Sequence, residues 1–242
     1  MKSNLTLPPS VEERLSGWMR IKERYQSQAP AKARPRPTVT ISRQFGCEGF
    51  PLALQLQKLF EGVSGEPWSI FDKELIERVA RDEQISLQLL RHLEEPVRFL
   101  EAYGFHPRGK VTTDEAFAKI AVHLIHFAKE GNAIIVGRGG AILCQPLDNC
   151  FHFRLEAGLD WRLGSLVRRM GLTAKAAGDL ERSQTKARDH FVREHLGVNG
   201  TERPLYDAVF SNERHGVEEI AAAILGYVKC GWKGEGIGRS TP

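Results

Sequence analysis

Two glycine-containing turns could bind an anion, and the first follows a β-branched apolar run at residues 38–41. This turn contains Arg43, Gln44, Gly46, Cys47, Glu48 and Gly49. Glycine lets backbone N–H groups approach an anion closely, and the N-terminus of a following helix adds a partial positive charge. Pro51 suits the first turn of such a helix. The pattern predicts a phosphate-binding loop, with an ordinary tight strand-to-helix turn as the alternative.

The first turn lacks two residues of a complete phosphate-binding loop. The complete pattern, GxxxxGK[ST], has a lysine for the β- and γ-phosphates and a hydroxyl for magnesium. Here Glu48 and Phe50 occupy positions where basic residues would help, and no serine or threonine follows. The place of the loop in the chain therefore indicates phosphate binding more clearly than its composition does.

The second turn is Gly137-Arg138-Gly139, at the end of the fully apolar run 133–136. An arginine between glycines at the end of a buried strand presents a planar cation at the rim of a ligand site, where it suits a phosphate. The alternative is an arginine that forms a salt bridge with a neighbouring helix.

A third candidate is the basic segment 162–203, which has nine Lys or Arg against five acidic residues. Four of its cations lie at helical spacings: Arg182, Lys186, Arg188 and Arg193. Like charges on one face repel unless an anion lies between them. The segment is predicted to close over phosphates, with a solvated helix as the alternative.

No resident metal site is predicted. His123 and His126 lie three residues apart on an amphipathic pattern, but no third ligand accompanies them, so they are interpreted as residues at the rim of a core helix. The four cysteines, at 47, 144, 150 and 230, lack the CxxC spacing and are interpreted as reduced thiols.

The elements that must position these residues alternate between short strands and helices. Strands are expected at 38–41, 68–71, 133–136, 151–155 and 208–210, and helices at 11–28, 52–60, 74–81, 87–93, 114–130, 159–170, 174–191 and 217–228. This alternation predicts an α/β fold with a parallel five-stranded sheet flanked by helices. Ligands of such sheets bind beyond the carboxyl ends of the strands, where the candidate turns lie.

The basic charge of the chain is concentrated in its N-terminal arm. Residues 1–37 carry a net charge of +5, whereas the remainder carries −1. A nucleic-acid-binding core is therefore not favoured, although the arm could contact a protein or an anionic partner. The alternative is a solvated extension. Prolines at 30, 35 and 37 predict a linker, and the chain after residue 229 is expected to be a flexible glycine-rich tail.

No apolar run approaches the roughly 20 residues that span a bilayer, and residues 1–9 lack the core of a signal peptide. A cytoplasmic protein is expected.

Five segments together resemble the cytidylate kinase-like family, a branch of the nucleoside monophosphate kinases. They are Ile-Ser-Arg-Gln-Phe-Gly at 41–46, Phe-Asp-Lys-Glu-Leu-Ile at 71–76, Glu-Gly-Asn-Ala-Ile-Ile-Val-Gly-Arg-Gly at 130–139, the basic stretch 186–197 and residues 206–219. The third segment is the most specific. The resemblance covers about residues 38–228.

The resemblance implies a P-loop kinase fold with a helical insertion at about 82–115 and a lid at about 171–203. It implies ATP with Mg²⁺ as the phosphate donor and a CMP-like monophosphate as the acceptor. The implied donor-phosphate residues are Arg43, Gln44, Gly46, Cys47, Glu48 and Gly49, and the implied donor-base residues are Asn212 and Glu213. The implied acceptor residues are Asp72, Gly137, Arg138, Gly139 and Arg182, and the implied catalytic residues are Lys186, Arg188 and Arg193.

Two departures from the family leave a second interpretation open. The family loop usually runs Gly-Ser-Gly-Gly-Arg, whereas residues 46–50 of this chain are Gly-Cys-Glu-Gly-Phe. Glu48 therefore replaces a glycine of the family loop, and Phe50 replaces its arginine. An uncompensated negative charge about 4 Å from a phosphate costs about 4 kcal/mol at an intermediate dielectric. The alternative to a kinase is therefore a catalytically inactive relative that serves as a nucleotide sensor or partner-binding module. Homo-oligomer formation stays open.

Overall fold

The computed structural model describes residues 10–26, 36–81, 111–196 and 206–232. The predicted helix at 87–93, most of the predicted insertion, most of the proline linker and most of the predicted tail lie outside these ranges. Among the described residues, no helix is both long and apolar enough to cross a bilayer.

Five parallel strands form the central sheet, in the order β2-β3-β1-β4-β5. Their bounds are Thr38–Arg43 for β1, Ser69–Phe71 for β2, Ala133–Val136 for β3, Cys150–Glu156 for β4 and Ala208–Ser211 for β5. The central strand β1 pairs with β3 through Ile41 and Val136 and with β4 through Ile41 and Phe153. The predicted α/β fold with a parallel five-stranded sheet is therefore confirmed.

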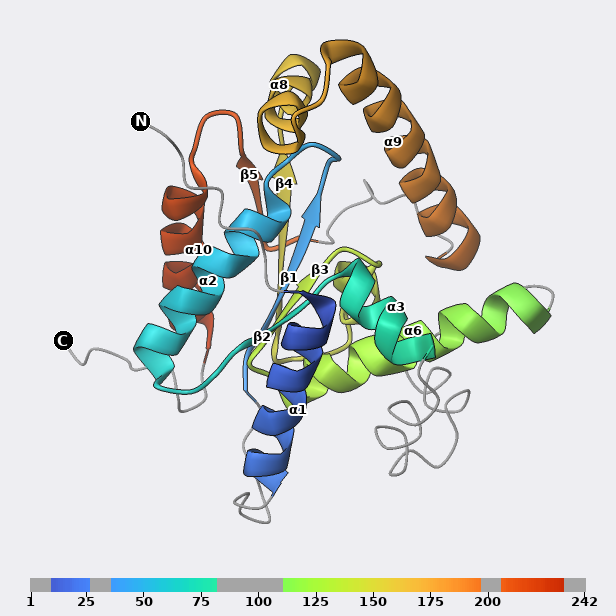
Figure 1. Ribbon diagram of the computed structural model, residues 1–242. Coiled ribbons are helices and arrows are strands. Elements are labelled where there is room, and N and C mark those ends of the chain that lie inside the picture. Colours follow the sequence, from blue (N-terminus) through green and yellow to red (C-terminus); the bar gives the residue numbers. More distant parts are fainter. Residues whose placement is uncertain (1–9, 27–35, 82–110, 197–205, 233–242) are drawn as a thin grey trace.

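Helices cover both faces of the sheet (Figure 1). They are α1 (Val11–Gln26), α2 (Gly49–Ser64), α3 (Lys73–Arg81), α6 (Val111–Glu130), α7 (Gly140–Leu143), α8 (Leu159–Met170), α9 (Ala174–Leu196) and α10 (Val217–Gly231). Of these, only the short α7 has no counterpart among the predicted elements.

Alternating residues of each strand divide the core into two layers, as the period of a strand requires. Ile134 and Val136 of β3 pack with α2 and α10, whereas Ile135 packs with α3, α6 and α1. Because both faces are covered, β3 is apolar throughout, as the run 133–136 predicted.

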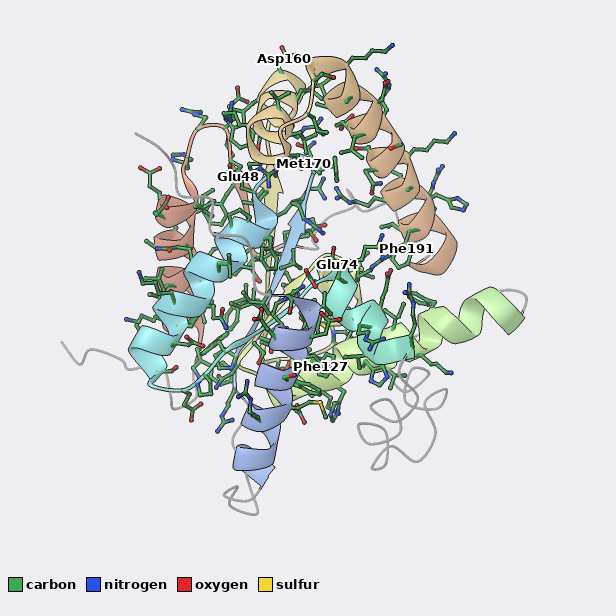
Figure 2. The ribbon with its side chains drawn as sticks, viewed as in Figure 1. Glu48, Glu74, Phe127, Asp160, Met170 and Phe191 are labelled. Atoms are coloured by element: carbon green, nitrogen blue, oxygen red, sulfur yellow. The ribbon has the colours of Figure 1, made fainter. Side chains whose placement is uncertain are left out.

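Helix α1 is part of this packing. Leu15 and Trp18 are buried, and the Trp18 ring lies edge-on to Phe71 and Phe127, with centroids 6.0 and 5.0 Å away. Figure 2 shows Phe127 in the layer beneath α1. The alternative of a solvated extension is therefore wrong for the part of α1 around Leu15 and Trp18.

His152 is a buried histidine of β4 that makes the stability of the protein depend on pH. Its Nδ1 lies 2.8 Å from Oγ1 of Thr40 on β1, and burial lowers the pKa of the imidazole to about 4. The ring is therefore neutral in the folded protein at neutral pH.

We expect the free energy of unfolding to fall as the pH drops from about 6.5 towards 4, by about 1 kcal/mol per pH unit from this group. In that window the unfolded chain binds a proton at residue 152 and the folded protein does not, so acid favours unfolding. Urea unfolding of the wild type and of His152→Gln at pH 7 and pH 5 measures the difference. An equal loss of stability in both proteins would contradict the assignment.

Candidate functional site

A cavity of about 700 Å³ lies at the carboxyl ends of the sheet strands. Three segments supply most of its walls: the turn after β1, the turn after β3 and one face of α9. Its charged lining residues are Arg43, Lys73, Arg138, Arg154, Arg162, Glu181, Arg188, Asp189 and Arg193. Seven of these nine carry positive charge, so the cavity is suited to an anion.

Arg43 leaves the end of β1 and lies across the end of β3. A Cβ atom at Gly137 would collide with Nη1 of Arg43, and Gly137 also has a φ of +79°. Glycine is therefore required at 137 for two reasons: the backbone is left-handed, and the guanidinium occupies the space of a side chain. Gly137 of the second turn therefore leaves room for the side chain of Arg43 from the first turn.

Arg188 reaches the same place from α9. Its Nη1 donates a hydrogen bond to the backbone oxygen of Arg43, at 2.5 Å. Burial, the nearby Arg188 charge and Arg138 lower the pKa of Arg43 to about 10, with burial the largest cause. Burial and then Arg154 lower the pKa of Arg188. The two cations are thus desolvated and lie close to each other.

Arg43 and Arg188 also have no counter-ion in the part of the chain that the structure describes. No carboxylate of the described residues lies within ion-pair distance of either guanidinium. A buried charge is costly unless an opposite charge pairs with it. An anionic ligand between the two arginines would supply that partner, and guanidinium groups bind phosphate oxygens well.

Arg138 lines the cavity but is already paired. It forms an ion pair with Glu77 of α3, and its guanidinium carbon lies 5.1 Å from the ring centroid of Phe191 on α9. Figure 2 shows Phe191 on the side of α9 that faces the rest of the molecule. The Nε of Arg138 is buried and has no hydrogen-bond partner among the described residues. The φ of Arg138 is +52°, which is unusual for a residue with a side chain. The structure thus combines both interpretations of Arg138: a salt bridge to a helix and a place at the ligand rim.

The other two buried arginines of the cavity are held by carboxylates. Nη1 of Arg162 donates to the backbone oxygen of Phe45 at 2.9 Å and also pairs with Glu181 of α9. Nε of Arg154 lies 2.7 Å from Glu156. Because these charges are compensated, Arg43 and Arg188 are the stronger anion ligands of the cavity.

One face of α9 borders the cavity, through residues 181, 184, 185, 187, 188, 189, 191, 192 and 193. Most of these residues are three or four apart, as the helical period requires. Arg182 and Lys186 fall outside this face: both are exposed, and Arg182 pairs with Asp179 at 2.5 Å. The structure therefore brings Arg188 and Arg193 to the cavity but not Arg182 or Lys186.

The rest of the first turn is engaged with the protein itself. The backbone N–H of Gln44 donates to the oxygen of Leu155, that of Cys47 to the oxygen of Gln44, and that of Glu48 to Oδ1 of Asn212. Among the predicted loop residues, Arg43 and Gln44 line the cavity, whereas Gly46, Cys47, Glu48 and Gly49 do not. The N–H groups at 44, 47 and 48 are therefore not turned towards a ligand.

Glu48 lies between the start of α2 and α8 (Figure 2). Its Oε1 is 4.0 Å from Nε of Arg169, and Nη2 of Arg169 donates to the backbone oxygen of Gly46 at 2.8 Å. The negative charge of Glu48 is thus partly compensated, so its expected penalty against a phosphate is smaller than for a lone carboxylate. Burial raises the pKa of the neighbouring Cys47 thiol to about 11, despite the arginines around it.

Three further predicted site residues serve connections within the fold. Asn212 binds the N–H of Glu48, and Oε2 of Glu213 accepts the N–H of Gly158 at 2.9 Å. Asp72 does not line the cavity; its Oδ1 is paired with Arg14 of α1 at 2.9 Å.

Several cavity residues were not predicted from the sequence: Lys73, Arg154, Arg162, Glu181, Phe191 and Tyr206. Arg154 had a detectable signal, because it is an arginine in a predicted strand whose other residues are mostly apolar. Glu181 is the acidic residue at the start of the α9 face that also carries Arg188. Arg162 lies on α8, where its exposure to the cavity depends only on tertiary packing.

Comparisons with known proteins agree with this architecture. The model of the cytidylate kinase-like family matches residues 38–214. An uncharacterized protein from Eubacterium ventriosum ATCC 27560 has a solved structure similar to this one, with a TM-score of 0.61, 19% identity, and coverage of 81% of this chain and 99% of that chain. A second solved structure, TT1252 from Thermus thermophilus, gives a TM-score of 0.42 at 13% identity and covers 83% of this chain and 100% of its own. No curated protein matches the chain.

Proposed function

Because this chain belongs to the cytidylate kinase-like family, we propose that it binds nucleotides and transfers a phosphoryl group from ATP to a CMP-like nucleoside monophosphate. The observation that carries the proposal is the pair of half-buried arginines, Arg43 and Arg188, with no carboxylate of the described residues within ion-pair distance. In this proposal the transferring phosphoryl group lies between them.

Phosphoryl transfer relies on positioning and on compensating the charge of the transferred group. Arg43 and Gln44 come from the rigid end of β1, whereas Arg188 and Arg193 come from α9. We propose that α9 belongs to a lid, so that lid closure adds two cations to the site. Arg138 and Lys73 would bind the acceptor on the opposite wall.

In this proposal the side chains of the cavity bind the phosphates of ATP directly, whereas Mg²⁺ is bound through those phosphates. Uncompensated guanidinium groups suit the phosphates of a nucleotide. The described residues contain no group of three or more His, Cys, Asp or Glu side chains that could hold a metal ion. Mg²⁺ commonly binds through substrate phosphates and retains several waters, so it would enter with the nucleotide and neutralise charge on its phosphates.

One observation supports the second candidate function, a catalytically inactive nucleotide-binding protein. Three N–H groups of the first turn, at 44, 47 and 48, already have acceptors within the protein. A donor triphosphate would have to bind mainly through side chains. A protein that binds a monophosphate and not ATP would then serve as a nucleotide sensor or partner-binding module.

Calorimetric titration with CMP and with ATP–Mg²⁺, followed by an assay of phosphoryl transfer, distinguishes the two functions. The proposed kinase binds both and forms CDP. Binding of CMP without ATP binding or transfer would overturn the kinase and support the sensor.

A further inference from the structure

Arg14 of α1 lies beside the functional site, although it is far from the site residues in sequence. Its Nη1 is 2.9 Å from Oδ1 of Asp72, and its Nη2 is 3.6 Å from Oε2 of Glu74. The guanidinium carbon also lies 5.4 Å from the ring centroid of Phe50, directly after the first turn. The Arg14 side chain is only 11% exposed and that of Asp72 only 16%, so solvent screens this ion pair weakly.

The helix around Arg14 is fixed by packing. Leu15 and Trp18 are buried against the layer of α3 and α6. Arg14 therefore reaches Asp72 from a docked helix and not from a free arm.

Asp72 interacts with Arg14 on one side and with the charge of Arg43 on the other. It follows the end of β2, and its Oδ1 accepts the N–H of Leu75 at 3.0 Å, which fixes the carboxylate at the start of α3. From the other side, the Arg43 side chain crosses the end of β3, the strand that separates β1 from β2. The Asp72 carboxylate is close enough to Arg43 to favour its charged form.

These contacts define a competition for one carboxylate. Without Arg14, the nearest cation known to feel the charge of Asp72 would be Arg43, which is half-buried and has no other described carboxylate as a partner. An Asp72–Arg43 interaction would then oppose the binding of an anionic ligand at Arg43.

We propose that Arg14 is a positioning residue that holds Asp72 away from Arg43 and so keeps the Arg43 guanidinium available for the phosphate of a nucleotide. This inference rests on the proposed function of the cavity. It gives the N-terminal helix a role in ligand affinity beyond its contribution to the core.

The test is a double-mutant cycle with the full chain and CMP as the calorimetric probe. Arg14→Gln is expected to weaken CMP binding about tenfold. Asp72→Asn keeps the side-chain oxygen that accepts the Leu75 N–H but removes the charge. In the Asp72→Asn background, the further change Arg14→Gln is expected to alter the affinity by less than about twofold.

Arg20→Gln is the matched control, because Arg20 is an exposed arginine of the same helix whose Nε binds the oxygen of Ser16. It should leave CMP affinity at the wild-type value. Thermal unfolding of each variant separates a loss of affinity from a loss of fold.

The outcomes distinguish the proposed role of Arg14 from the proposed nucleotide binding on which it rests. Failure of the wild type to bind CMP overturns both. Wild-type binding together with an undiminished affinity in Arg14→Gln, or a loss that Asp72→Asn does not abolish, overturns only the role of Arg14.

Discussion

The Arg188→Ala protein is expected to lose at least about 10³-fold in the rate of phosphoryl transfer, the range seen when an arginine is removed from a transferring phosphoryl group. Arg188 is half-buried, its Nη1 contacts the backbone of Arg43, and no described carboxylate pairs with it. A charge placed in a desolvated site stabilises developing negative charge far more than a charge in water does.

The measurement is kcat with CMP and ATP–Mg²⁺, with circular dichroism melting to monitor the fold. Lys175→Ala is the matched control, because Lys175 is an exposed cation of the same helix that does not line the cavity. Arg188→Lys restores the charge but not the planar fork, so an intermediate rate is expected. A rate for Arg188→Ala within threefold of the control would contradict the role of Arg188.

Gly137→Ala is expected to have the second largest effect, because it changes both the backbone and the position of Arg43. The φ of +79° at 137 costs an alanine about 1–2 kcal/mol in the free energy of unfolding. The new Cβ would also collide with Nη1 of Arg43 and displace the guanidinium from the cavity. Losing a charge-assisted contact of about 2–3 kcal/mol would weaken CMP binding roughly 30- to 100-fold.

Gly65→Ala separates these two effects. Gly65 ends α2 with a φ of +67°, and an added Cβ there meets no atom within 4 Å. It should therefore lose a similar amount of stability without losing CMP affinity. Urea unfolding and calorimetry of both variants give the comparison. If both proteins bound CMP as the wild type does, Gly137 would not position Arg43.

The sheet could be predicted from the sequence because most residues of β1 to β4 are buried, which favours apolar and β-branched side chains. All five strands lie within two residues of their expected bounds. Arg43, Gln44 and residues 137–139 line the cavity because they lie at or just after the ends of strands, and parallel strands end at one edge. Their roles in binding a nucleotide stay predictions. The short α7 was missed because four residues carry too little periodicity.

The rest of the site depends on tertiary packing that no local pattern records. Arg182, Lys186 and Arg188 all lie on α9. Which of these cations borders the cavity depends on which face of the helix packs towards the sheet. The docking of α1 decides the environment of Asp72, since Arg14 lies 58 positions earlier in the chain. Sequence showed that the first turn was unusual, but not that Arg169 faces Glu48 or that Asn212 binds its N–H.

The central claim is that Arg43 and Arg188 bind the phosphate of a nucleotide, and the affinity of the wild-type protein for CMP compared with cytidine tests it most directly. The two ligands differ only in the phosphate. Charge-assisted contacts from these two half-buried arginines predict that CMP binds at least about 100-fold more tightly than cytidine in a calorimetric titration. Equal affinities, or no binding of CMP, would contradict the claim.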